Sequence, residues 1–99
     1  MSEIIKPTKI IEGKLFYELD FEFITMLAQR MELGKQNGKY EKYKWKEGID
    51  VEQLNQAILR HLLEVLKGNL EDEGQKYGHY MAIVANIMMS IHELKKNRK

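Results

Sequence analysis

Side chains that can act on a phosphate group gather in the second half of the sequence. His61 and Glu64 are one helical turn apart, and His79 and Asn86 are two turns apart. An acidic run at residues 71–73 falls between the two pairs. Carboxylate oxygens and imidazole nitrogens brought together in this way could hold a divalent cation against a phosphate chain.

A purely structural interpretation of the same residues stays open. In it, His61 is a hydrogen-bonded core histidine and Glu64 is the surface partner of Arg60, four residues earlier. The acidic run is then a solvated turn. The spacing alone does not choose between the two interpretations.

A stretch of lysines and aromatic residues precedes this region. Ammonium groups can neutralise phosphates, and an aromatic ring offers a face on which a base can stack. The residues concerned are Lys35, Lys39, Lys42, Lys44 and Lys46, with Tyr40, Tyr43 and Trp45. Alternatively, Trp45 and Tyr40 close the top of a small helical core, and the lysines keep the loop soluble.

The composition of the 99 residues excludes several classes of protein. The chain has no cysteine, which rules out disulfides, thiolate catalysis and Cys-ligated zinc. A net charge of +1 and one basic loop make nucleic acid an unlikely partner. The most apolar stretch, residues 80–91, is too short to cross a bilayer, and residues 1–7 lack the features of a secretory signal. We therefore expect a cytoplasmic protein without a membrane partner.

These residues must be positioned by helices, and we expect an all-α protein. Apolar residues recur every three or four positions after Asp20 and after Asp50, which are suitable N-caps, and Gly34 and Gly68 are suitable stops. The expected single domain, 1–99, is a small antiparallel bundle of three main helices. It divides into an extended arm (1–19), a first helix (20–34), the basic and aromatic loop (35–49), a second helix (50–67), an acidic turn (68–75) and a third helix (76–96).

The third helix has a broad apolar arc. We expect one stripe of this arc to face the core, formed by Tyr80, Ile83, Val84, Ile87, Ile91 and Leu94. Because Met81, Ala85 and Met88 widen the arc, the helix should contact more than one neighbour. Three helices provide few neighbours, so we expect a homo-oligomer, a dimer or larger.

Three segments resemble, in order, a known family. They are the run Gly38–Gly48, the segment Arg60-His61-Leu62-Leu63, and the series Gly78-His79 with Asn86. Together they are similar to the phage-type family of dATP/dGTP diphosphohydrolase N-terminal domains, which resemble the MazG all-α nucleotide pyrophosphohydrolases. The resemblance covers about residues 13–94.

The resemblance implies an oligomeric, all-helical protein that uses Mg²⁺ or Mn²⁺ and releases pyrophosphate from purine deoxynucleoside triphosphates. If the chain is encoded by a phage, the site of action is the cytoplasm of the host cell. The implied catalytic residues are His61, Glu64 and His79, and the implied metal ligands are Glu64, Glu71 and Asp72. The implied substrate contacts are Lys14, Lys39, Tyr40, Trp45, Arg60 and Asn86.

The chain departs from the family pattern at two places. Ala82 stands where the family commonly has a second histidine three residues after the first, and Phe16 follows Lys14 where an arginine is favoured. Of the acidic pattern in MazG relatives, only Glu64 keeps a carboxylate. The alternative to an enzyme is therefore a non-catalytic oligomer that sequesters a nucleotide, such as a signalling nucleotide of host defence. A third alternative is a helical assembly protein.

Overall fold

Three α-helices and one short 3₁₀ helix make up the computed structural model, which describes residues 17–39, 41 and 44–96. Their bounds are α1 Phe21–Gln36, η2 Lys44–Lys46, α2 Val51–Leu66 and α3 Gly78–Lys96. The described residues contain no β-strand, only an isolated bridge between Asp72 and Gln75. The expected all-α class is confirmed.

Both expected N-caps are present. The side chain of Asp20 accepts a hydrogen bond from the backbone N–H of Glu22 at 3.0 Å, and that of Asp50 accepts one from Glu52 at 2.9 Å. Each carboxylate satisfies a backbone donor that the first helical turn leaves unpaired. The two caps fix where α1 and α2 begin.

The helix ends follow the expected glycine rule at one position and not at the other. Gly68 has a φ of 92° directly after α2, as the predicted stop requires. Helix α1 instead continues past Gly34, which is buried, and the left-handed residue that ends it is Gly38, with a φ of 76°. The backbone N–H of Lys39 donates to the carbonyl of Gly34 at 2.9 Å and closes the last turn.

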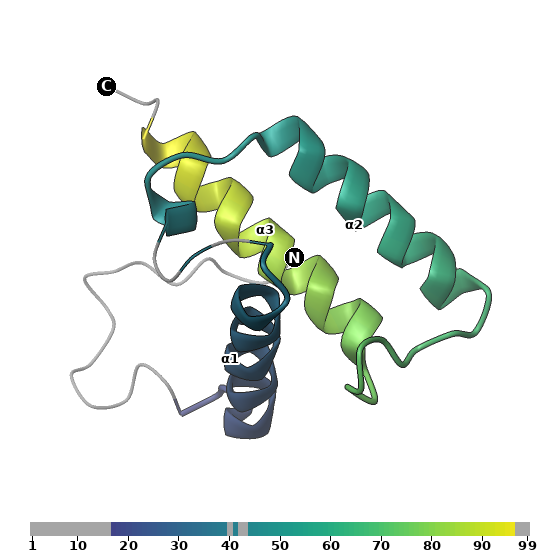
Figure 1. Ribbon diagram of the computed structural model, residues 1–99. Helices are drawn as coiled ribbons and strands as arrows, with labels where there is room; N and C mark the ends of the chain where they lie inside the picture. The colour runs from purple at the N-terminus through teal and green to yellow at the C-terminus, as the bar shows by residue number, and fades with distance from the viewer. Residues whose placement is uncertain (1–16, 40, 42–43, 97–99) are drawn as a thin grey trace, which may run out of the picture.

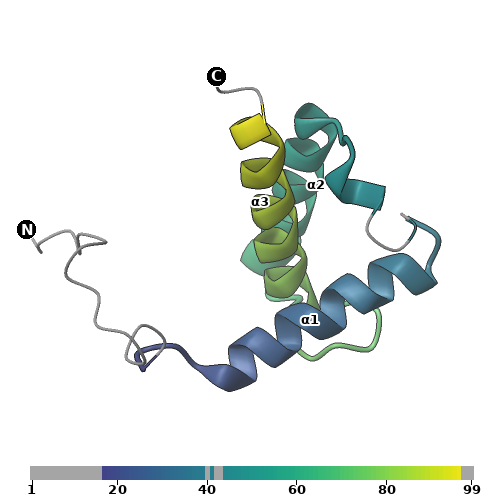
Figure 2. The ribbon, with the colours of Figure 1, turned by 90° about the vertical axis from the view of Figure 1, so that its left-hand side faces the viewer.

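Helices α2 and α3 run antiparallel and side by side, whereas α1 lies across the end where α3 begins (Figures 1 and 2). Within the described part of the chain, α1 contacts α3 but not α2. The bundle is therefore open between α1 and α2, with α3 joining them.

The buried face of α3 differs from the expected stripe. The buried residues of this helix are Gly78, Met81, Ala82, Ala85, Met89 and Ser90. Tyr80, Ile87, Ile91 and Leu94 are instead exposed, with Ile91 and Leu94 each at 52%. Because α1 and α2 contact two different sides of α3, the residues that face these contacts, Met81 and Met89 among them, are buried, and the rest of the apolar arc faces outward.

The exposed apolar residues of α2 and α3 form a surface that we call the apolar back. It consists of Leu59, Leu62, Leu63 and Leu66 from α2, and Tyr80, Ile87, Ile91 and Leu94 from α3. At 100° per residue, each set occupies one face of its helix, away from the face that lines the opening between α1 and α2. None of the described helices combines the length and hydropathy that a membrane crossing requires.

Candidate functional site

A cleft of about 240 Å³ fills the opening between α1 and α2. Its apolar lining comes from α2, α3 and the segment before α2: Ile49, Leu54, Ala57, Ala82, Ala85 and Met89. Its polar lining is Arg30, Lys39, Asp50, Gln53, Arg60, His61 and Asn86. Three cations line the cleft beside one carboxylate, which already caps α2. Two of these cations, Arg30 and Lys39, also pair with carboxylates of the acidic run outside the lining. The cleft suits a ligand with an apolar, flat part and an anionic part.

The cations of the cleft differ in how their charge is satisfied. Arg30 is only 5% exposed, and its Nη1 atom is buried without a hydrogen-bond partner among the described residues. Lys39 and Arg60 are exposed at the rim. A buried, unsatisfied N–H donor costs free energy, so an anionic ligand that accepts from Arg30 would relieve that cost.

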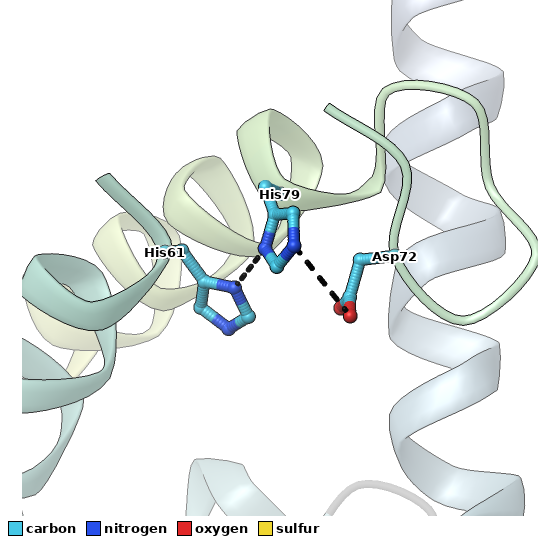
Figure 3. A group of neighbouring side chains, drawn as sticks. All are labelled: His61, Asp72 and His79. Atoms are coloured by element: carbon cyan, nitrogen blue, oxygen red, sulfur yellow. Dashed lines mark hydrogen bonds and ion pairs between the residues drawn. The ribbon is translucent and has the colours of Figure 1, made fainter. Parts of the chain in front are cut away.

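Two imidazoles meet at the wall of the cleft. The Nδ1 atoms of His61, on α2, and His79, at the start of α3, are 2.8 Å apart (Figure 3). One ring must donate and the other accept, so at least one Nδ1 carries a lone pair. The Nε2 atom of His79 lies 3.9 Å from Oδ1 of Asp72, which favours the proton on that nitrogen. From these contacts we assign the Nδ1 proton to His61, which leaves its Nε2 free to accept a proton.

Asp72 is held in a tight turn. The backbone groups of Asp72 and Gln75 exchange two hydrogen bonds of 3.0 Å, and the residues between them, Glu73 and Gly74, have φ values of 52° and 82°. Positive φ at both central positions is the pattern of a two-residue hairpin turn, and it is uncommon for a glutamate. The turn directs two consecutive carboxylates toward α1.

Arg30 connects α1 to this turn. Its Nη2 atom donates to Asp72 at 2.9 Å and to Glu73 at 3.2 Å. Glu73 also accepts from Asn37 and forms an ion pair with Lys39 at 3.2 Å. These contacts satisfy both carboxylates and fix the position of Asp72 relative to His79.

Burial lowers the pKa of His61, and coulombic interactions with His79, Arg30 and Lys39 lower it further. The Asp72 carboxylate opposes this effect. The lowered pKa favours a neutral His61 at pH 7, which is compatible with the short contact to His79.

The two other predicted metal ligands lie apart from this cluster. Glu64 accepts hydrogen bonds from Asn69 at 2.9 Å and Lys67 at 3.2 Å, and these two contacts are the main causes of its lowered pKa. Glu71 is exposed. In the described part of the chain, the only set of three donors close enough to share a metal ion is His61, Asp72 and His79, whose ligand atoms lie within 4.8 Å of one another.

The predicted substrate contacts divide into three groups. The structure places Lys39, Arg60 and Asn86 in the lining of the cleft, together with His61. Trp45 instead packs edge-on against His92, with ring centroids 5.2 Å apart, near the opposite end of α3 from His79. Lys14 and Tyr40 lie outside the described residues.

The sequence reasoning missed Arg30, which both lines the cleft and holds the acidic turn. A signal was present, because Arg30 follows Phe23 by seven residues and precedes Gly34 by four, in phase with the apolar face of its helix. A cation at such a position must find partners when it is buried. The acidic run at residues 71–73 offered such partners, and the structure pairs Arg30 with Asp72 and Glu73.

Comparisons with known proteins identify a family over most of the chain. The family described as dATP/dGTP diphosphohydrolase, N-terminal, matches residues 8–99. No curated protein and no solved structure matches the chain.

Proposed function

We propose that this chain, which belongs to the family of dATP/dGTP diphosphohydrolase N-terminal domains, binds a purine deoxynucleoside triphosphate in the cleft and hydrolyses it. The observation that carries the proposal is the buried, unpartnered Nη1 of Arg30 in a cleft that Lys39 and Arg60 also line. Such a set of cations matches a polyanion. The apolar lining gives the base a surface to pack against.

The size of the cleft suggests how the ligand would lie. At about 240 Å³ it is smaller than the roughly 300–1,000 Å³ of typical ligand pockets. We therefore expect the base and sugar to occupy the interior and the phosphates to extend along Lys39 and Arg60 at the rim. Asn86 would donate to the base or the sugar.

The proposed reaction is attack of water on the α-phosphorus. A bond forms between the water oxygen and this phosphorus, and the bond to the β-phosphate oxygen breaks, so that a monophosphate and pyrophosphate result. The free Nε2 of His61 would accept the proton of the water. The rim cations would stabilise the charge of the leaving pyrophosphate.

The family resemblance implies Mg²⁺ or Mn²⁺ bound by carboxylate oxygens. The residues present fit a site made only of such oxygens poorly. Glu64, Glu71 and Asp72, the expected ligands, do not converge within the described chain. Magnesium often enters such sites on the substrate phosphates, with few protein ligands. We therefore derive no step of the reaction from a protein-bound magnesium ion.

The experiment is incubation of the protein with each of the four dNTPs and with Mg²⁺ or Mn²⁺, followed by chromatography of nucleotides and pyrophosphate. We expect monophosphate and pyrophosphate from dATP or dGTP. His61→Asn should lower kcat by about 10²–10⁴, the range for a lost general base, while nucleotide still raises the melting temperature.

Arg60→Ala should weaken nucleotide binding, because it removes a cation that lines the cleft. The matched control is Lys44→Ala, which removes an exposed lysine paired with Glu47 at 3.6 Å and outside the cleft. Equal effects of the two substitutions would contradict the proposed location of the phosphates.

A second candidate function is sequestration of a nucleotide without cleavage. The observation that favours it is the absence of a convergent carboxylate set among the described residues. In that case a purine nucleotide would stabilise the protein and be recovered intact. The same incubation therefore separates the two functions.

We also propose that the protein acts as a homo-oligomer in the cytoplasm. The apolar back exposes eight large side chains at 41–74%. At about 100 Å² each they present roughly 800 Å², the area that one partner contributes to an interface of standard size. A second copy of the chain offers the same apolar side chains, which suits a symmetric interface.

A further inference from the structure

The cluster of His61, His79 and Asp72 has a donor set unlike the carboxylates expected for magnesium. It offers two imidazole nitrogens and one carboxylate oxygen, all within 4.8 Å of one another. Imidazole suits zinc, copper, iron and nickel, whereas magnesium and manganese suit oxygen ligands. The chemistry of these donors therefore selects against magnesium.

The spacing of the two imidazoles is close to that of a pair of metal ligands. Two nitrogens bound tetrahedrally at 2.0–2.1 Å from one ion are about 3.3 Å apart. The Nδ1 atoms of His61 and His79 are 2.8 Å apart, so the rings need to separate by only about 0.5 Å. A metal ion could then replace the proton that the two rings share.

Asp72 is positioned independently of any ion, against the ring nitrogen of His79 that does not contact His61. Asp72 belongs to the hairpin turn, and Arg30 holds its Oδ2 at 2.9 Å while Oδ1 faces His79. The backbone N–H of His79 donates to the carbonyl of Leu70 at 3.0 Å, which fixes the start of α3 beside the turn. Hydrogen-bonded partners of this kind orient the ligands in metal sites.

We propose that Nδ1 of His61 and Nδ1 of His79 bind one divalent transition-metal ion of the zinc class, while Asp72 orients His79 through Nε2 of that ring. The three side chains come from different elements, namely α2, α3 and the acidic turn (Figure 3). Two imidazole ligands leave other positions of the ion open to water or substrate. The site does not depend on the proposed function, because these side chains would bind the ion with or without nucleotide. An ion on Nδ1 of His61 leaves the ring proton on Nε2, so the general-base role proposed above belongs to the metal-free ring.

The test uses the full chain, stripped with a chelator and desalted, in the absence of nucleotide. Titration with Zn²⁺ in a calorimeter should show one ion per chain, and a large excess of Mg²⁺ should not displace it. Titration with Co²⁺ should produce the intense visible absorption of a four- or five-coordinate ion. A weak spectrum like that of aqueous Co²⁺ would overturn the proposal.

Variants locate the ion. His79→Gln and, separately, Asp72→Asn should each weaken Zn²⁺ binding by 10-fold or more. The matched control is His92→Gln, which alters the one histidine outside the cluster, on the same helix. Circular dichroism shows whether each variant is folded. Asp72→Asn weakens the ion pair with Arg30, so if that variant does not fold, His79→Gln alone provides the test. Unchanged binding by folded His79→Gln, or equal weakening by His92→Gln, would refute the site.

Discussion

At the scale of single residues, His61 belongs both to the lining of the cleft and to the pair of imidazoles that it forms with His79. Burial is the main cause of its lowered pKa. The groups that act on it electrostatically come from α1 and the segment after it, the acidic turn and α3: Arg30, Lys39, Asp72 and His79. Its protonation is therefore linked to the stability of the fold.

The metal-free protein should lose stability as the pH falls below about 6.5, the ordinary pKa of histidine. The pKa of His61 is lower in the folded state, so the unfolded chain takes up the proton first and is favoured. The loss should continue down to the folded pKa and then level off.

The measurement is urea unfolding between pH 7.5 and pH 5 with a chelator present. His61→Asn, which keeps a donor near His79, should flatten this part of the stability profile. An unchanged slope would show that His61 is not the group responsible.

Gly78 is a second residue whose identity the structure explains. A Cβ at this position would lie 2.3 Å from the carbonyl oxygen of Asp72 and 2.8 Å from the Cβ of Asp72. Gly78→Ala should therefore destabilise the protein by about 1–3 kcal/mol, the usual cost of overpacking, and displace Asp72 from His79.

Urea unfolding and Zn²⁺ titration of Gly78→Ala check both effects. Gly48→Ala is the control, because a Cβ there would meet nothing within 4 Å. Similar losses of stability in the two variants would mean that the close approach at Gly78 is not the cause.

At the scale of elements, the sequence predicted where the helices are better than which faces they bury. Asp20, Asp50 and Gly68 act locally, through hydrogen bonds or backbone angles within a few residues, and all three were identified correctly. The burial of α3 depends on two neighbours that cross it on different sides, and periodicity in one helix does not contain that information. The stripe expected to face the core is therefore partly exposed.

The same distinction applies to the candidate site. His61, His79 and Asp72 could be selected from residue type and position, and the structure brings them together. The placement of Trp45 beside His92, rather than in the cleft, depends on how the loop returns to the far end of α3. Charge and aromatic composition did not indicate that path.

Arg30 is the main polar connection between α1 and the rest of the site. Arg30→Met should reduce the free energy of unfolding by about 2–4 kcal/mol, because Asp72 and Glu73 would lose the partner that compensates their partial burial. Thermal or urea unfolding measures the loss.

Lys35→Met is the corresponding control on the same helix, since Lys35 pairs with Glu32 at 3.1 Å on the exposed side. Its effect should stay below about 1 kcal/mol. If the two substitutions cost the same, Arg30 has no special part in holding α1.

At the scale of the whole molecule, the apolar back and the cleft lie on different sides of the α2–α3 pair. An assembly through the apolar back would therefore leave the cleft open to solvent. Light scattering at micromolar concentration should show a dimer or larger species.

Leu63→Glu combined with Ile91→Glu should shift the protein toward a monomer, because the two positions belong to the apolar back, one on each helix, and are about half exposed. Leu19→Glu is the control, since Leu19 is 48% exposed and precedes α1. A wild-type protein that remains monomeric at high micromolar concentration would contradict the proposed assembly.

The position of Trp45 determines what an optical experiment on this protein reports. It is the single tryptophan of the sequence, and it contacts His92 rather than the cleft lining. Its fluorescence should therefore follow the docking of the 44–46 turn on α3 and its loss on denaturation. A purine that fills the cleft should leave the emission maximum unchanged, so ligand titrations require a labelled nucleotide.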